Sequence, residues 1–326
     1  MNRCPITYLE CGNERYSEQG LKLLDSRLHY LADFPYTAEQ QRKLAVDYSD
    51  KLSIQGIQPK LSARLSATKH QFEVVERKGT FIIKPPHLFY QYLPENEDLT
   101  MHLAQAVGID VPLHGLMYNV DGTLSYFIKR FDRIGRGEKI AVEDFAQLLG
   151  FGRDTKYDGS MEQLVDVIER YCTFPVLEKI KLFRLTLFAF LVGNEDMHLK
   201  NFSLIVYENC VSLSPAYDLI NSYMVTSSQE ELALPLAGKK RKFKKEHFFD
   251  YYGRDHLGLN EPALSDVSKT FTAIQPTWFA LIDYSFLPDE NKSFYKDLVQ
   301  KRFKRLFPEE IAKLHLGPNL PFWRRI

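Results

Sequence analysis

The residues best able to do chemistry lie in one polar run, Asn194 to Asn201, which follows the most apolar stretch of the chain. Within it, Asp196 and Asn201 have the D-x-x-x-x-N spacing of phosphoryl-transfer catalytic loops. In such loops the aspartate accepts the proton of the substrate hydroxyl and the asparagine binds Mg²⁺. The alternative is a helix cap followed by a solvated loop. A polar cluster beside an apolar helix is costly unless its groups are satisfied, so we favour the catalytic loop.

A second carboxylate, Asp218, follows in the run Ser214 to Leu219. Before it, Phe202–Tyr207 and Cys210–Leu213 are short apolar segments around two turn residues, which predicts two strands. If these strands form a hairpin, the chain returns Asp218 to the polar run. An aspartate and an asparagine would then offer two oxygen ligands to a Mg²⁺ that bridges nucleotide phosphates. The alternative is an Asx-type turn at the end of a strand.

Three features upstream complete the set of parts. Ser53–Lys60 is a small-residue loop with one glycine, which lets backbone N–H groups approach an anion, although a single glycine also fits a plain turn. Lys84 ends an apolar strand, where phosphate-binding kinase lysines lie, although such lysines are usually on the surface. Glu97, on the next helix, is a candidate partner for Lys84, in competition with Glu95 and Asp98. The order of these parts along the chain is that of kinases.

The segment before residue 135 has the pattern of a sheet crossed by one helix. Phe72–Val75 and Phe81–Ile83 are β-branched or aromatic runs separated by turn residues, which predicts a hairpin. Glu95–Val107 has apolar residues at steps of four and ends before a glycine, which predicts an amphipathic helix. Leu116–Val120 and Thr123–Lys129 are joined by Asp-Gly and predict a second hairpin.

From Glu143 onward the pattern is mainly helical, with Met161–Tyr171 and Leu177–Val192 as the clearest helices. The second is apolar nearly all round, so it should lie in the middle of its lobe. Glycines near residue 135 predict a boundary between lobes 1–134 and 135–326. We expect the first 45 or so residues to be helical and peripheral.

The composition is that of an ordinary globular protein. The chain has 326 residues, 44% of them hydrophobic and 26% charged, with 42 basic and 42 acidic side chains. Zero net charge gives no overall attraction to nucleic acid or to an anionic membrane. Four cysteines with no metal-binding spacing, and no apolar stretch of about 20 residues, predict a cytoplasmic protein without a membrane span.

Together these residues resemble the HipA family of bacterial serine/threonine kinase toxins. The resemblance implies an α+β, bilobal protein-kinase-like fold, with a sheet-containing N-lobe and a mainly helical C-lobe. It extends from about Ser53 to Asp218, with a weaker match in Leu232–Gly238. The matching segments are Ser53–Ser62, Phe81–Pro85, Asn96–Glu97, Lys129–Arg133, Asn194–Ser203 and Ser214–Asp218.

The resemblance also implies roles for individual residues. Asp196 would be the catalytic base, Asn201 and Asp218 the Mg²⁺ ligands, and Lys84, paired with Glu97, would bind the phosphates of ATP. Further ATP contacts are implied for a loop over the phosphates, a hinge beside adenine and the catalytic segments: Gln55, Gly56, Ile57, Gln58, Pro59, Lys60, Lys129, Arg130, Phe131, His198, Lys200 and Tyr217. Ser53 matches the serine that family members autophosphorylate, which expels the loop and silences the kinase.

Only 52 residues precede Ser53, so the chain resembles the short form of the family, HipT, rather than the long toxins. In the short form the missing subdomain is a separate small protein, HipS, encoded beside a DNA-binding HipB. The resemblance therefore implies HipS-like and HipB-like partners, with DNA contact at most indirect through the antitoxin. Family substrates are aminoacyl-tRNA synthetases, and the residues do not indicate which one applies here.

Two other functions remain open. A small-molecule kinase would use the same machinery and order of parts. A nucleic-acid-binding regulator would use the basic run Lys239–Lys245, with further basic residues at Lys301–Arg305 and Arg324–Arg325, although such runs are more often solvated faces.

Overall fold

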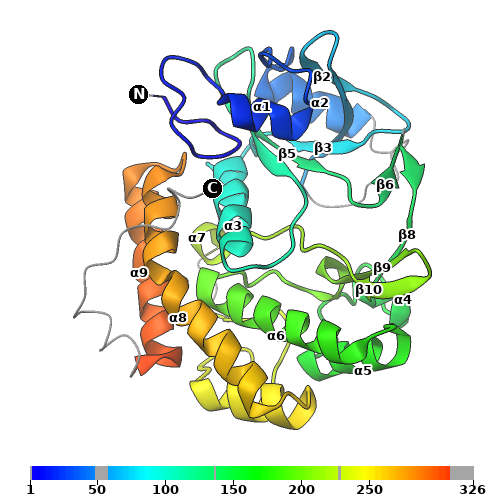
Figure 1. Cartoon of the computed structure of the whole chain (residues 1–326), viewed down its shortest axis with the longest axis vertical. Coiled ribbons are helices and arrows are strands. Elements are labelled where there is room, and N and C mark those ends of the chain that lie inside the picture. The colour runs from blue at the N-terminus through cyan, green and yellow to red at the C-terminus, as the bar shows by residue number, and fades with distance from the viewer. Residues whose placement is uncertain (1, 48–57, 136, 227–228, 309–326) are drawn as a thin grey trace. The chain divides into compact units, whose positions relative to one another are not determined.

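The computed structural model describes residues 2–47, 58–135, 137–226 and 229–308 (Figure 1). The chain divides into two compact units. The first contains residues 1–99, 112–139 and 284–287, and the second contains residues 100–111, 140–283 and 288–326. Helix α3 (Leu93–Ala106) begins in the first unit and ends in the second. The boundary between lobes at 134/135 stays a prediction.

Five described strands of the first unit form one antiparallel sheet with the order β2-β1-β3-β5-β4. The strands are β1 (Leu61–Ser66), β2 (Gln71–Val74), β3 (Phe81–Lys84), β4 (His114–Tyr118) and β5 (Leu124–Lys129). The predicted hairpin of β4 and β5 is confirmed, and the helix expected from Glu95 to Val107 corresponds to α3. A short pair, β6 (Arg133–Ile134) and β7 (Glu138–Lys139), follows this sheet in the chain.

The hairpin predicted for Phe72–Ile83 is wrong, although both of its strands exist. Strand β1 lies between them, with Ala63 opposite Val74 on one side and opposite Phe81 on the other. The alternation of apolar residues identifies a strand, but it carries no information on which neighbour satisfies the strand's N–H and C=O groups.

The N-terminal residues are not peripheral, which corrects the prediction for this segment. They include two short helices, α1 (Glu18–Leu24) and α2 (Ala38–Asp47), and the remaining described residues are mostly irregular. Their apolar side chains pack against the strands in one hydrophobic core. The buried residues of this core are Cys4, Ile6, Tyr16, Leu21, Leu28, Leu31, Phe34, Ala45, Leu61, Ala63, Phe72, Phe81, Ile83, Met117 and Phe127. Irregular segments of this kind show no helical or strand period, so sequence pattern alone does not place them in a core.

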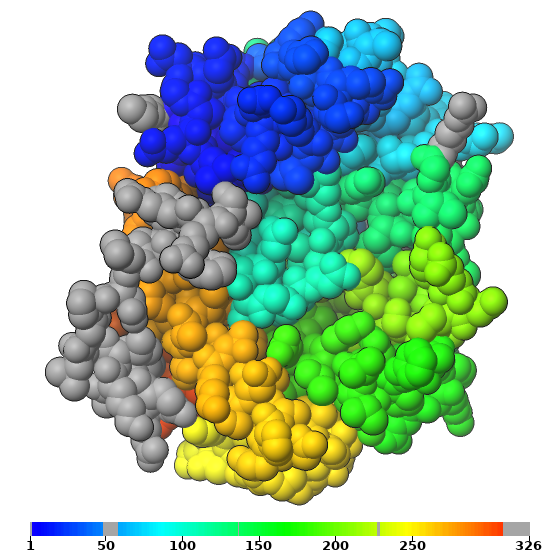
Figure 2. Space-filling model, in the orientation of Figure 1, coloured from blue at the N-terminus to red at the C-terminus, as the bar shows by residue number. Residues whose placement is uncertain are grey.

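The second unit is built around helix α6 (Pro175–Val192), whose residues Leu185–Val192 are all buried. It contacts α5 (Met161–Tyr171), η2 (His247–His256) and α9 (Asp289–Leu306). The helices predicted at α5 and α6 are confirmed. Figure 2 shows the yellow residues of η2 beside the orange residues of α8 (Glu261–Tyr284). An ion pair between Arg254 and Glu261 joins these two helices.

A small sheet of the order β10-β9-β8 also belongs to this unit. The predicted hairpin of β9 (Ser203–Tyr207) and β10 (Cys210–Leu213) is confirmed. The pattern did not indicate β8 (Ala141–Asp144), which pairs with β9, because a four-residue, half-exposed strand leaves little periodicity to detect. This unit also contains three short helices, α4 (Phe145–Leu148), η1 (Leu199–Asn201) and α7 (Tyr223–Thr226).

Among the described residues, every helix is too short or too polar to cross a membrane. The four cysteines are free.

Candidate active site

The polar run begins where α6 ends. Gly193 terminates the helix in the left-handed conformation, with φ of +78°. A side chain there would also collide with its surroundings, because a Cβ atom would lie 2.6 Å from Cδ2 of Leu298 and 2.9 Å from Oδ1 of Asn221. Glycine is therefore required both for the backbone conformation and for the space.

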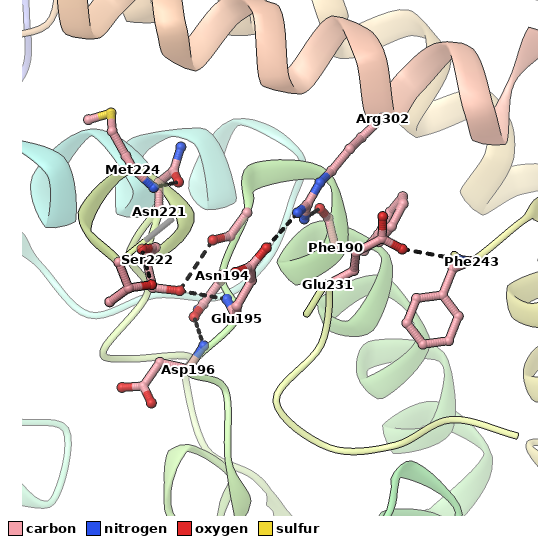
Figure 3. Close-up of polar contacts among 12 residues, drawn as sticks. Phe190, Asn194, Glu195, Asp196, Asn221, Ser222, Met224, Glu231, Phe243 and Arg302 are labelled. Atoms are coloured by element: carbon pink, nitrogen blue, oxygen red, sulfur yellow. Dashed lines mark hydrogen bonds and ion pairs between the residues drawn. The ribbon is translucent and has the colours of Figure 1, made fainter. Parts of the chain in front are cut away.

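The backbone of the loop holds Asp196 at its exposed turn. The Asp196 N–H donates to Oδ1 of Asn194 at 3.3 Å, and its carbonyl accepts from the His198 N–H at 2.9 Å. Asn194, Glu195 and His198 are buried, whereas Asp196 is exposed. Figure 3 shows its carboxylate pointing away from the buried Glu195 side chain. The Tyr157 hydroxyl donates to this carboxylate.

The β9–β10 hairpin returns the chain to the loop, as predicted. Beyond it, the Tyr217 hydroxyl donates to the carbonyl of Lys200 at 2.8 Å and lies 2.6 Å from the Ser203 hydroxyl oxygen. Tyr217, the residue before Asp218, is thus hydrogen-bonded to the 3-10 helix η1 (Leu199–Asn201). This helix contains the metal-ligand candidate Asn201. Asp218 itself has a φ of +54°, a conformation that aspartate adopts more readily than most residues.

His198 is close enough to Asp196 and Asp218 for both carboxylates to influence its pKa. Burial lowers the pKa of its imidazole to about 4, against the fields of Asp196 and Asp218, which raise it. Its Nε2 lies 2.8 Å from Nζ of Lys156. At neutral pH the ring is therefore uncharged, and it adds no positive charge that would compete with a cation near these carboxylates.

The donor atoms in this part of the second unit fit a hard divalent cation. Asn201 offers an amide oxygen and Asp218 a carboxylate, and oxygen ligands of these two kinds suit Mg²⁺, Ca²⁺ or Mn²⁺. The described loop has no cysteine and a single histidine, and its one sulfur, that of Met197, is buried and accepts from Nδ2 of Asn194 at 3.9 Å. The loop therefore offers no set of soft ligands.

In the first unit, Lys84 ends strand β3 and pairs with Glu97 of α3. Both side chains are buried, with exposed fractions of 4% and 2%. The two competing carboxylates have other surroundings. Asp98 accepts a hydrogen bond from the Tyr8 hydroxyl and lies 3.0 Å from Nδ1 of His114. Burial raises the pKa of Glu95 to about 7. The structure thus forms the ion pair that the sequence suggested.

The remaining predicted nucleotide contacts are placed only in part. Lys129 ends β5 and is exposed, and Arg130 pairs with Asp132 through two hydrogen bonds of 2.9 and 2.7 Å. Phe131 follows them, and Gln58, Pro59 and Lys60 precede β1 with partly exposed side chains. The residues predicted to form the rest of the loop lie outside the described part of the chain: Ser53, Gln55, Gly56 and Ile57.

Sequence reasoning missed two groups at this site. Tyr157 gave no signal, since it belongs to an irregular segment far from the loop in sequence. The basic run Lys301–Arg305 predicts a solvated face, yet Arg302 is 3% exposed and its Nη2 lies 2.7 Å from Oε1 of Glu195. A signal was available in its neighbours, because Val299 and Phe303 are apolar at helical spacing and place Arg302 near a buried face.

Comparison with known sequences gives one family, the HipA-like C-terminal domain, which matches residues 52–278. A protein of Haemophilus influenzae named "Putative kinase" is 28% identical over 266 residues, which are 76% of this chain and 77% of that protein. The serine/threonine-protein kinase toxin HipA of Shewanella oneidensis is 29% identical over 216 residues. The match covers 58% of this chain and 48% of that toxin, so the chain spans about half of its length.

Two solved structures share the fold. The Shewanella oneidensis HipA, in a complex with HipB and its operator DNA, superimposes with a TM-score of 0.65 at 23% identity, over 89% of this chain and 76% of that one. The Helicobacter pylori proinflammatory kinase CtkA gives a TM-score of 0.53 at 13% identity, over 72% of this chain and 90% of that one. The predicted α+β kinase-like fold is confirmed, and the predicted enzyme class agrees with the names of the relatives.

Proposed function

Because the chain belongs to the HipA-like C-terminal domain family, we propose that it is a serine/threonine protein kinase that uses ATP and Mg²⁺. The observation that carries the proposal is the catalytic loop. Its buried residues support one exposed carboxylate, Asp196, while the β9–β10 hairpin brings the segment of Asp218 to the same loop. A general base and two metal-ligand candidates are what phosphoryl transfer requires of a protein.

In the proposed reaction, Asp196 accepts the proton of a serine or threonine hydroxyl. Asn201 and Asp218 would hold the metal, which neutralises charge on the phosphates when it is bound. Lys84, oriented by Glu97, would contact the phosphates. The protein's part is chiefly positioning and charge stabilisation, because the loose transition state needs little covalent assistance.

The other nucleotide contacts belong to the same proposal. Lys129 to Phe131 would bind beside adenine, Gln55 to Lys60 would cover the phosphates, and Tyr217 would keep Asp218 against the loop. The neutral His198 and the cation of Lys200 would lie near the phosphates. His198 then contributes a polar but uncharged surface at neutral pH, because burial lowers its pKa to about 4.

The biological role we propose is that of a toxin in a toxin–antitoxin system. One relative of this chain, the Shewanella oneidensis HipA, is named a serine/threonine-protein kinase toxin. The solved HipA structure that shares the fold is a complex with HipB and operator DNA, and both facts support the proposal. By the resemblance to the short form, the partners would be HipS-like and HipB-like proteins. The acceptor would be an aminoacyl-tRNA synthetase, and autophosphorylation at Ser53 would silence the kinase.

The deciding experiment compares wild-type protein with Asp196→Asn, each mixed with γ-labelled ATP, Mg²⁺ and a cell lysate. The proposal expects labelled protein bands with wild type and none with the variant, while circular dichroism shows both folded. Label found only in small metabolites would instead identify a small-molecule kinase. Phosphoproteomics after induction of the two proteins then names the acceptor, and mass spectrometry of the purified chain tests Ser53.

A further inference from the structure

Helix α9 reaches the catalytic loop through one buried arginine. Arg302 places its Nη2 2.7 Å from Oε1 of Glu195, and its Nη1 donates to the carbonyl of Phe190 near the end of α6 (Figure 3). Its guanidinium also lies over the Phe190 ring, 5.0 Å from the ring centroid. The side chains of Arg302 and Glu195 are only 3% and 2% exposed. One side chain therefore joins α9, the end of α6 and the loop.

This arrangement is expensive for stability alone. Removing two charges from water costs several kcal/mol per ion, and a buried ion pair often stabilises no better than apolar side chains of the same size. Burial lowers the pKa of the Arg302 guanidinium from its usual value, the direction expected when desolvation opposes a charge. A different role explains better why a charged pair lies directly behind this loop.

Glu195, the residue immediately before Asp196, is held at its side chain by Arg302 and at its backbone by Ser222. Besides its carboxylate, Glu195 is anchored by its N–H, which donates to Oγ of Ser222 at 2.7 Å. Ser222 in turn donates to the carbonyl of Gly193 at 3.3 Å. On the same side, Asn194 accepts from the Asp196 N–H. The backbone around Asp196 is thus fixed from the buried side, while its carboxylate faces outward (Figure 3).

We propose that Glu195 and Arg302 are positioning residues that hold the Asp196 carboxylate where it can accept the proton of the substrate hydroxyl. Neither residue contacts substrate, and both act through the loop backbone. The proposal rests on the proposed kinase function. Since a displacement of about 1 Å can cost about 100-fold in rate, release of this anchor should reduce turnover more than it reduces nucleotide binding.

The same helix provides a matched control. Arg305 follows Arg302 on α9 and pairs with Glu231 at 2.6 Å, in an ion pair that is only partly buried, with side chains 29% and 15% exposed. Glu231 also accepts from the N–H of Phe243 at 3.0 Å. This second pair anchors the segment before η2 and not the catalytic loop. Arg305 also lies over the Phe190 ring, 5.3 Å from its centroid. A variant at Arg305 therefore disturbs α9 packing and this ring contact, but leaves the Arg302–Glu195 pair and the Glu195–Ser222 hydrogen bond in place.

The test measures ADP release at saturating ATP, with casein as a generic acceptor, together with the Kd for Mg·ATP and thermal unfolding. Arg302→Met should reduce the maximal rate by about 10- to 100-fold and change the Kd for Mg·ATP less than twofold. Arg302→Lys should recover part of that rate, and Glu195→Gln should behave as Arg302→Met does. Arg305→Met should unfold at a lower temperature and retain its rate within about twofold.

Two results would overturn the proposal: a folded Arg302→Met protein with a wild-type rate, or an Arg305→Met protein that loses as much rate as Arg302→Met. If Arg302→Met is not recovered folded, Glu195→Gln decides in its place by the same criteria. Asp196→Asn separates this failure from that of the proposed function. Turnover by Asp196→Asn would remove the kinase mechanism, whereas an inactive Asp196→Asn with wild-type Arg302→Met would remove only the positioning role.

Discussion

The Tyr157 hydroxyl donates a hydrogen bond to the Asp196 carboxylate. In the proposed mechanism, the Tyr157 hydroxyl therefore competes with the substrate hydroxyl for this carboxylate. Burial and this carboxylate both raise the pKa of Tyr157 above its usual value, so the phenol stays protonated and remains a donor at neutral pH.

Replacement of Tyr157 by Phe should ease binding of the protein acceptor, because the competing donor is lost. A hydrogen bond of about 0.5–1.5 kcal/mol corresponds to a roughly two- to tenfold lower acceptor KM. Steady-state kinetics with acceptor varied at saturating ATP measures the effect. A higher acceptor KM in the folded variant would show that Tyr157 helps to bind the acceptor instead.

The buried Lys84–Glu97 pair predicts a strong coupling in stability. Lys84→Met or Glu97→Leu alone removes the ion-pair partner of a buried charge and should lower the free energy of unfolding by about 3–5 kcal/mol. The double variant removes both charges and should lose less than either single variant. Urea unfolding of all four proteins gives the coupling energy. Additive losses would contradict the interaction.

His198 predicts a loss of stability in mild acid. The pKa of its imidazole is lowered from 6.5 to about 4 in the folded protein, so between these pH values the unfolded chain binds more protons than the folded one. Stability is therefore complete above about pH 6.5 and declines as pH falls, by up to about 3 kcal/mol near pH 4.

The contribution of His198 is isolated by comparing urea unfolding of wild type and His198→Asn between pH 7 and pH 5. Other histidines, including buried His114, whose pKa is lowered to about 3, contribute equally to both proteins. The wild-type free energy of unfolding should fall more steeply with decreasing pH than that of the variant. Parallel curves would mean that His198 titrates alike in both states.

Gly193 predicts a position-specific cost for alanine at the start of the catalytic loop. Gly193→Ala combines a left-handed backbone with contacts of 2.6 and 2.9 Å, and should destabilise by about 2–4 kcal/mol. Gly150→Ala is the control, since Gly150 has a φ of +77° but nothing within 4 Å of the added Cβ, which leaves about 1–2 kcal/mol. Chemical denaturation compares the two, and equal losses would exclude the steric contribution at Gly193.

Much of the local structure could be predicted because it depends on neighbours in the chain. The helices α5 and α6 have a clear apolar period, and the β4–β5 hairpin contains an Asp-Gly turn whose glycine has a φ of +78°. The D-x-x-x-x-N spacing identified the loop for the same reason. Asp196 and Asn201 lie on one short segment, so their proximity needs no long-range pairing.

Sequence by itself thus predicted helices α3, α5 and α6, most strands, and the order along the chain of the parts of the proposed kinase site. The tertiary structure alone decided that β1 separates β2 from β3, that irregular N-terminal residues cover the sheet, and that Arg302 is buried against Glu195. Periodicity records which face of an element is apolar, whereas its partner depends on contacts between residues far apart in the chain. The basic run therefore does not show that Arg302 is buried, because its burial depends on an ion pair with Glu195, which is distant in the chain.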